Sequence, residues 1–324
     1  MSCAPDQNES VINKLLEKKD ISDLFAQLES GLSMSEINTL LLEFFRNRLK
    51  AVKPAELMRQ YDQNRFVKPS DIDPLYNCRE SLVLLEKAAS YGYKALDLSP
   101  VSILGSCSVM AKVDQNNVIS ALRGTEVVSD ATNALALHIC TLKKREKIPV
   151  TGRLRFCSIH RHIRAQKFRG PDQLPHFILY SMVISGRDEG NFIFEKEALN
   201  ETIKFYNEYL ESLGWLKNIR YIVWPRVCDK DNDENQMMHF SGEILDFIKK
   251  NNSINIIEEE PPNESNYYTG LQCKIKAAYR DAEFEVGDMG FVDWPQNLLQ
   301  NKKERMLISG MGLERLIMHA SQKQ

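Results

Sequence analysis

The chain has 324 residues, which is enough to bury a sizeable core in one large domain or two smaller ones. Its 42 basic and 44 acidic residues give a formal net charge of -2, which excludes a global positive field for nucleic acid. Seven cysteines without a C-x-x-C pair argue against a disulfide framework or zinc site and favour a cytoplasmic location, and no apolar run approaches the roughly 20 residues of a membrane span.

The N-terminal part of the chain has a helical pattern, from Val11 to about Asn64. A capping box at Ser33–Glu36 precedes an amphipathic run that ends near Leu49. Proline and polar residues in 66–71 indicate a linker, because the residue before a proline is restricted to extended conformations. We therefore expect a helical extension over 1–68 and a second domain over 69–324.

The rest of the chain predicts an α+β fold, an antiparallel sheet flanked by helices. Short strands that follow one another with short connections favour antiparallel pairing. Helices are expected at 79–91, 195–213, 241–250 and from Leu313, and strands at 94–98, 109–113, 118–122, 154–159, 177–185, 219–224, 254–257, 271–278 and 306–309.

Few local motifs point directly to chemistry. Neither glycine-rich phosphate loop is present, so arginine side chains would have to hold any nucleotide. The run Asp229–Asp233 imitates the start of a calcium loop, but Glu234 and Phe240 stand where glycine and glutamate are needed, so a solvated acidic loop is the better interpretation. Arg315 falls in the first turn of the last helix, where the helix dipole disfavours a cation unless an anionic ligand is present.

Several segments together resemble the catalytic core of class II aminoacyl-tRNA synthetases of the histidyl type. Gly312–Arg315 after a strand resembles motif 3, whose arginine reaches the ATP phosphates. Arg161 and Phe177 are placed like the motif 2 arginine and the phenylalanine that stacks on adenine. A guanidinium on phosphate and an aromatic ring on the base form a sound nucleotide clamp.

The amino-acid side of the resemblance rests on two further pairs. Tyr267 and Tyr268 resemble the tyrosine pair that lines the amino-acid pocket, and Asp130 and Thr132 fall where the family grips the α-amino group. Pro100 is placed like the motif 1 proline of the dimer interface, which implies a homodimer. The resemblance covers about residues 75 to 320 in the correct order, and it implies ATP and Mg²⁺ as cofactors.

The sequence also departs from the family pattern. Ile163 replaces the motif 2 glutamate, and Leu179 and Val183 stand where the histidyl family has polar groups for the substrate ammonium. Asn263 stands where an arginine assists activation. Because the chain ends at Gln324 without an anticodon-binding domain, charging of tRNA is not expected.

Several interpretations remain open. The preferred one is an ATP-binding paralogue that forms an adenylate of an acid other than histidine, since the nucleotide side is better kept than the amino-acid side. The alternative is a non-catalytic regulatory subunit like the histidyl-tRNA synthetase-like subunit of ATP phosphoribosyltransferase, whose N-terminal helices dock a protein partner. An RNA-binding module has the least support from the charge balance, and the arginines could also be remnants of an ancestral site.

Overall fold

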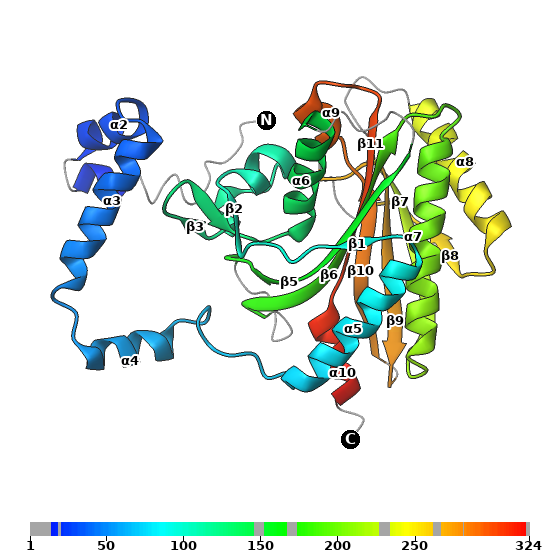
Figure 1. Ribbon diagram of the computed structural model, residues 1–324, viewed down its shortest axis with the longest axis horizontal. Helices are drawn as coiled ribbons and strands as arrows, with labels where there is room; N and C mark the ends of the chain where they lie inside the picture. The colour runs from blue at the N-terminus through cyan, green and yellow to red at the C-terminus, as the bar shows by residue number, and fades with distance from the viewer. Residues whose placement is uncertain are drawn as a thin grey trace. The chain divides into compact units, whose positions relative to one another are not determined.

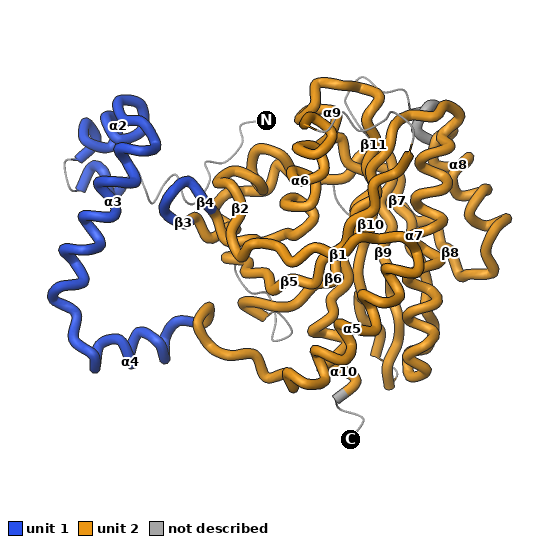
Figure 2. Tube along the Cα trace, viewed as in Figure 1, with its two compact units in different colours: residues 1–64, 121–125 blue, residues 65–120, 126–324 orange. Residues whose placement is uncertain are grey.

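The structure is a computed structural model that describes residues 14–18, 21–145, 152–166, 174–226, 234–261, 267–280 and 282–321. The acidic run Asp229–Asp233 and the position Asn263 lie outside these residues. The chain divides into two compact units (Figure 2). Unit 1 comprises Met1–Asn64 with Ala121–Thr125, and unit 2 comprises Arg65–Ser120 with Glu126–Gln324.

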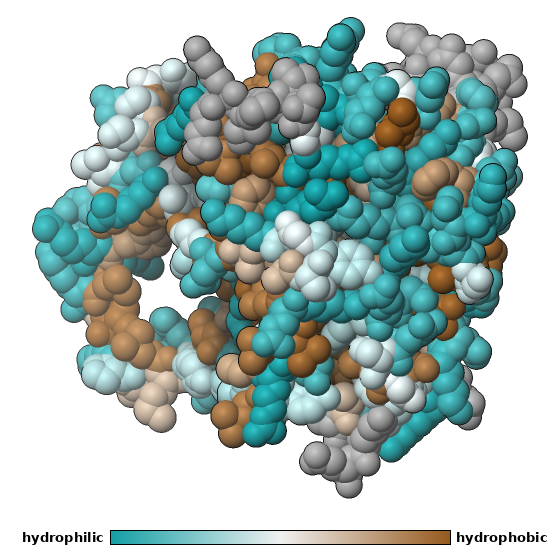
Figure 3. All heavy atoms as spheres, turned by 45° about the vertical axis from the view of Figure 1, so that its right-hand side comes forward, coloured by the Kyte–Doolittle hydropathy of each residue, from teal (hydrophilic) through white to brown (hydrophobic). Residues whose placement is uncertain are grey.

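Unit 1 contains the helices α2 (Ser22–Ser30), α3 (Met34–Leu49) and α4 (Pro54–Gln63). The predicted capping box is confirmed, because Ser33 Oγ accepts the Glu36 N–H at 3.3 Å and Glu36 Oε2 accepts the Ser33 N–H at 2.8 Å. None of the three helices has a buried residue, and apolar surface is visible along this part of the chain in Figure 3. Their leucines and phenylalanines are therefore exposed within unit 1.

Unit 2 is built on a sheet of eight strands in the order β1-β5-β6-β11-β10-β9-β7-β8 (Figure 1). The six central strands pair antiparallel, whereas the edge strands β1 and β8 run parallel to their neighbours. The strands are β1 (Lys94–Ala95), β5 (Leu154–Ile163), β6 (His176–Arg187), β7 (Lys217–Arg226), β8 (Ile256–Glu258), β9 (Thr269–Tyr279), β10 (Ala282–Phe291) and β11 (Glu304–Met311).

Helices cover both faces of this sheet, because each face carries alternate apolar residues of the strands. The face here called the core face packs against α5 (Pro74–Ser90), α7 (Ile193–Ser212), α8 (Glu234–Asn251) and α10 (Leu313–Ser321). The opposite face, the α6 face, packs against α6 (Ala131–Arg145), α9 (Trp294–Leu299) and the Tyr268 ring. No helix in the described ranges is both long and apolar enough to cross a bilayer.

The predicted α+β class is confirmed, but two local predictions are wrong. The strand expected at 109–113 is absent, since Ser106–Met110 forms a π-helical turn, η1. The buried Glu126 carboxylate holds this turn by accepting the N–H groups of Gly105 and Cys107 at 2.8 and 3.0 Å. The strand expected at 118–122 shrinks to β3 (Ser120–Ala121), which joins β2 (Val101–Ile103) and β4 (Thr125–Val127) in a small second sheet.

Candidate functional site

The register of the β5–β6 hairpin assigns Arg161 and Phe177 to different faces of the sheet. Arg161 lies opposite Ile178, a core-face residue, whereas Phe177 lies opposite His162 on the other face. Successive side chains of a strand point to opposite faces, so the guanidinium and the ring lie on opposite sides of the sheet. The nucleotide clamp expected from the sequence is therefore not assembled by this pair.

On the core face, Arg161 is held by the buried carboxylate of Glu314. Arg161 Nη1 donates to Glu314 Oε2 at 3.0 Å and to His176 Nδ1 at 2.9 Å. The same carboxylate accepts the Ile178 N–H at 2.8 Å and the Ser70 hydroxyl. Since Glu314 is only 2% exposed, it compensates the Arg161 charge inside the fold.

The other two residues assigned to the nucleotide have partners of their own. Phe177 stacks on the His162 ring at a centroid distance of 6.1 Å, and the Arg164 guanidinium carbon lies 5.1 Å from the Phe177 centroid. Arg315 is exposed and donates to the Glu285 carbonyl at 3.0 Å. Within the described residues no group of three or more His, Cys, Asp or Glu could hold a metal ion. Arg161, Phe177 and Arg315 therefore each contact other groups of the chain, and these contacts do not bring the three side chains together.

Three of the four residues assigned to the amino acid form one hydrogen-bonded cluster. Asp130 Oδ1 accepts the Thr132 N–H and hydroxyl at 2.9 and 2.7 Å, and Asp130 Oδ2 accepts the Tyr267 hydroxyl. A carboxylate offers about four lone-pair positions, so these bonds leave one acceptor position on Oδ2. Asp130 is partly exposed, and it can therefore still accept a donor from a ligand.

Tyr268 supports this cluster through packing. Its ring meets the Tyr267 ring edge-on at 4.8 Å, and Tyr267 in turn meets Trp294 at 5.5 Å. Burial raises the pKa of both tyrosines well above the usual value, and the nearby Asp130 and Asp288 carboxylates raise it further. Both hydroxyls therefore stay protonated, and Tyr267 stays a donor to Asp130.

A row of small and polar residues crosses the α6 face beside this cluster. The strand registers align Ser158, Ser181, Gly310 and Asp288 on the neighbouring strands β5, β6, β11 and β10. A side chain built on Gly310 would meet no atom within 4 Å, so open space lies over this glycine. The hydroxyls of Ser158 and Ser181 are buried and have no hydrogen-bond partner in the described part of the chain.

Asp288, at one end of this row, has an unusual acidity. Burial, with the Glu285 and Asp130 carboxylates, raises its pKa to about 6 against the lowering effects of Lys274 and of a hydrogen bond with Tyr268. The ammonium group of a ligand would relieve this repulsion. Asp288 and the free acceptor position of Asp130 are thus two groups that favour a cation.

His162 adds a buried donor to the same face. Its Nε2 accepts the Ala131 N–H, the first of helix α6, at 2.8 Å. Burial lowers the His162 pKa to about 3, so the ring is neutral and its proton sits on Nδ1. Nδ1 is buried without a partner in the described ranges. The face thus offers hydroxyls and an N–H to a polar ligand as well as carboxylates to a cation.

Sequence reasoning missed Asp288, Gly310, Ser158 and Ser181 as site residues. No strand was expected over 282–291, which left Asp288 without a position. A strand signal was present in 282–291, because apolar residues there are separated by one or two polar residues or glycines. In this pattern Asp288 and Gly290 flank the apolar Met289. Ser181 stands between Leu179 and Val183, which were judged apolar, and only the strand register could align it with Ser158.

Comparisons with known proteins were made by sequence and by structure. No family profile matches the chain, and no curated protein matches its sequence. A Bacillus halodurans ATP phosphoribosyltransferase regulatory subunit/histidyl-tRNA synthetase matches in structure with a TM-score of 0.58 and 12% identity, over 78% of this chain and 82% of that chain. An S. aureus histidyl-tRNA synthetase also has a TM-score of 0.58 and 12% identity, over 78% and 69%.

A histidine–tRNA ligase subunit from Alicyclobacillus acidocaldarius has a TM-score of 0.55 and 10% identity, and the match covers 79% of this chain and 97% of that chain. Threonyl-tRNA synthetases match as well. All these identities are low, so the likenesses concern the fold. The chain therefore has a core fold like that of class II aminoacyl-tRNA synthetases.

Proposed function

We propose that this protein is a non-catalytic regulatory relative of the histidyl-type synthetase fold, which binds a small amine-bearing compound on the α6 face and does not activate it with ATP. The observation that carries the proposal is the separation of Arg161 from Phe177 by the sheet, with Arg161 bound to the buried Glu314. A phosphate ligand on the α6 face would have no access to this guanidinium. The structural likeness to the Bacillus halodurans ATP phosphoribosyltransferase regulatory subunit/histidyl-tRNA synthetase supports the same interpretation.

The ligand class follows from the groups on the α6 face. Asp130 keeps one acceptor position, and Asp288 carries a carboxylate that other carboxylates repel. Both favour an ammonium group, while the hydroxyls of Ser158 and Ser181 suit a polar group next to it. The open space over Gly310 gives such a compound room between them. An amino acid or a related amine fits this set.

The test compares ligand binding with catalysis in the purified protein. We expect at least one compound in a pool of amino acids and amines to raise the melting temperature, and no ATP–pyrophosphate exchange with any of them. Asp130→Asn and Gly310→Ala should abolish the ligand-induced shift, because they remove the charge and fill the open space. Gly242→Ala, which also adds a methyl group where space is open, is the matched control and should keep the shift.

Exchange that depends on an amino acid and disappears in Arg315→Ala would overturn the proposal and favour the adenylate-forming interpretation. If no compound in the pool raised the melting temperature, the proposed amine site on the α6 face would be contradicted. We also propose that the protein forms a homodimer and that its N-terminal helices bind a protein partner. They are checked by sedimentation and by co-purification with a candidate enzyme.

A further inference from the structure

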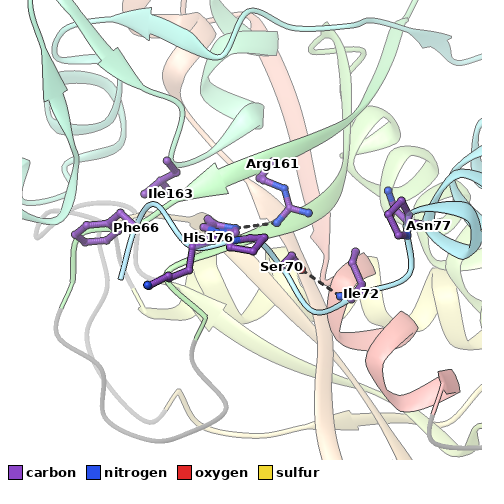
Figure 4. Close-up of a pocket in the computed structure, with 10 residues that line it drawn as sticks. Phe66, Ser70, Ile72, Asn77, Arg161, Ile163 and His176 are labelled. Carbon is purple, nitrogen blue, oxygen red and sulfur yellow. Dashed lines mark hydrogen bonds between the residues drawn. The ribbon is translucent and has the colours of Figure 1, made fainter. Parts of the chain in front are cut away.

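A cavity on the core-face side of the β5–β6 hairpin is separate from the amine site. It has a volume of about 480 Å³ and lies between the segment 66–74 and the ends of β5 and β6 (Figure 4). Ligand cavities for small molecules commonly have this size. Arg161 and His176 lie on one side of it and Phe66 on another.

The Arg161 guanidinium has donors to spare in this cavity. Only its Nη1 is engaged, by Glu314 and His176. Its Nε–H and the two Nη2–H groups have no partner among the described residues, and the side chain is 37% exposed. Nε and Nη2 form the edge of arginine that binds two oxygens of a phosphate or carboxylate side by side. The bonds of Nη1 therefore hold the guanidinium in place, and the Nε–Nη2 edge is available to an anion.

The charge and shape of the walls define the anion further. Lys68 lines the same cavity as Arg161, and the described lining residues include no Asp or Glu, while the Glu314 carboxylate lies behind them and accepts from Arg161 and Ser70. His176 is fixed as the Nε2–H form, because Nε2 donates to the Lys68 carbonyl at 2.6 Å while Nδ1 accepts from Arg161. Apolar side chains, Phe66, Ile72 and Ile163, form the remaining walls. The unused donors on one edge of Arg161 and the Lys68 side chain lie beside an apolar surface, and together they suit an anionic group on an apolar body, with Glu314 compensating part of the Arg161 charge.

We propose that this cavity is a second binding site, which takes a small phosphate monoester with an apolar or aromatic body. The phosphate binds the Nε–Nη2 edge of Arg161 with Lys68 as the second cation, and the body covers Phe66 and Ile163. A phosphate is favoured over a carboxylate because it carries about one charge more at neutral pH. The proposal does not depend on the amine site, since the two sets of residues lie on opposite faces of the sheet.

Residues 66–74, which line one side of the cavity, link ligand binding to the stability of the fold. Residues 66–74 are tied to unit 2 by the His176–Lys68 bond and by the Ser70 hydroxyl on Glu314. The same Glu314 carboxylate holds Arg161. A phosphate bound to Arg161 therefore contacts the residue that pairs with Glu314, and Glu314 in turn holds Ser70 of the segment. Phosphate binding should stabilise the segment 66–74 and the ends of β5 and β6.

Titration calorimetry of the full chain with phenyl phosphate, inorganic phosphate and benzoate tests the proposal. We expect phenyl phosphate to bind most tightly, since only it satisfies both the cations and the apolar wall. Arg161→Lys keeps the charge beside Glu314 but removes the fork, and it should weaken phenyl phosphate binding at least about tenfold, which is about 1.4 kcal/mol. Lys68→Met should also weaken it, and this variant leaves the Glu314 pair intact if Arg161→Lys folds poorly.

Arg155→Lys is the matched control. Arg155 lies on the same strand and face, but its Nε and Nη2 already donate to Glu201 at 2.7 and 2.8 Å. Its replacement should leave phenyl phosphate binding unchanged. The proposal is overturned if phenyl phosphate gives no binding, if Arg161→Lys and Lys68→Met bind it as the unchanged chain does, or if benzoate binds equally well.

Discussion

Glu314 has a structural role that its position in a family-like motif does not reveal. It follows the glycine turn at the start of α10, where a carboxylate is favoured by the helix dipole. Its two oxygens join three elements: the segment 66–74 through Ser70, β5 through Arg161 and β6 through the Ile178 N–H. Glu314, which precedes the Arg315 assigned to ATP, thus holds the sheet to its covering helix.

Removing this carboxylate should destabilise the fold. Glu314→Ala leaves the Ile178 N–H and Arg161 without their partner, and we expect a loss of about 2 kcal/mol in the free energy of unfolding, measured by urea denaturation. Glu243→Ala is the comparison, because Glu243 is 48% exposed and pairs with Lys196 at the surface. It should change stability little, and an equal effect of both substitutions would contradict the role assigned to Glu314.

Asp288 should make stability depend on pH. Its pKa is raised from 3.8 to about 6 in the folded chain, so the folded state holds its proton more tightly than the unfolded state. Stability is therefore lost as pH rises through this interval, and Asp288→Asn should remove the loss. We expect the variant to be more stable than the unchanged chain by about 3 kcal/mol at pH 8. Near pH 4 the difference should vanish, and a difference independent of pH would exclude the burial of this charge as its cause.

At the scale of elements, two glycines on neighbouring strands differ in the space around them. A side chain on Gly290 of β10 would meet the Tyr268 ring at 2.5 Å and the Leu271 carbonyl at 2.8 Å, whereas one on Gly310 of β11 would meet no atom within 4 Å. Gly290 lies next to a register shift between β9 and β10. The first glycine admits the ring that supports Asp130 and Tyr267, and the second leaves space for a ligand.

This contrast gives a paired prediction. Gly290→Ala should lower the free energy of unfolding by about 2 kcal/mol and change the near-UV circular dichroism, because the Tyr268 ring has to move. Gly310→Ala should leave both measurements almost unchanged while it blocks the amine ligand. If Gly310→Ala were as destabilising as Gly290→Ala, the space over β11 would be filled in solution.

The sequence predicted best those helices and strands that contain long runs of buried residues. Strands β6 and β9 and helix α7 lie on buried runs, and their expected ranges overlap the observed ones closely. Strand β10 was missed because acidic residues and glycines alternate with its apolar residues, and it is held by pairing with β9 and β11. The strand predicted at 109–113 was wrong because a local pattern does not include the distant Glu126, which holds the Ser106–Met110 turn.

At the scale of the whole molecule, the order of motifs was enough to predict the fold but not the faces of the sheet. The resemblance to class II synthetases predicted the fold of the solved structures that match, and it grouped Asp130, Thr132 and Tyr267, which are hydrogen-bonded to one another. Arg161 and Phe177 failed to meet because a shift of one residue in strand register exchanges the two faces. Register is a property of paired strands, and a list of motifs does not contain it.

The division into two units makes a final prediction about stability. Every residue of the two core clusters belongs to unit 2, and the helices α2, α3 and α4 bury none of their side chains. Removing residues 1–64 should therefore leave the melting temperature of the core within about 3 °C of the full chain, since about 1 kcal/mol shifts the melting temperature of a domain of this size by a few degrees. Scanning calorimetry of both chains measures this difference. A larger fall would mean that the N-terminal helices stabilise the core, whereas an unchanged melting temperature with altered self-association would assign their exposed leucines and phenylalanines to contacts between proteins.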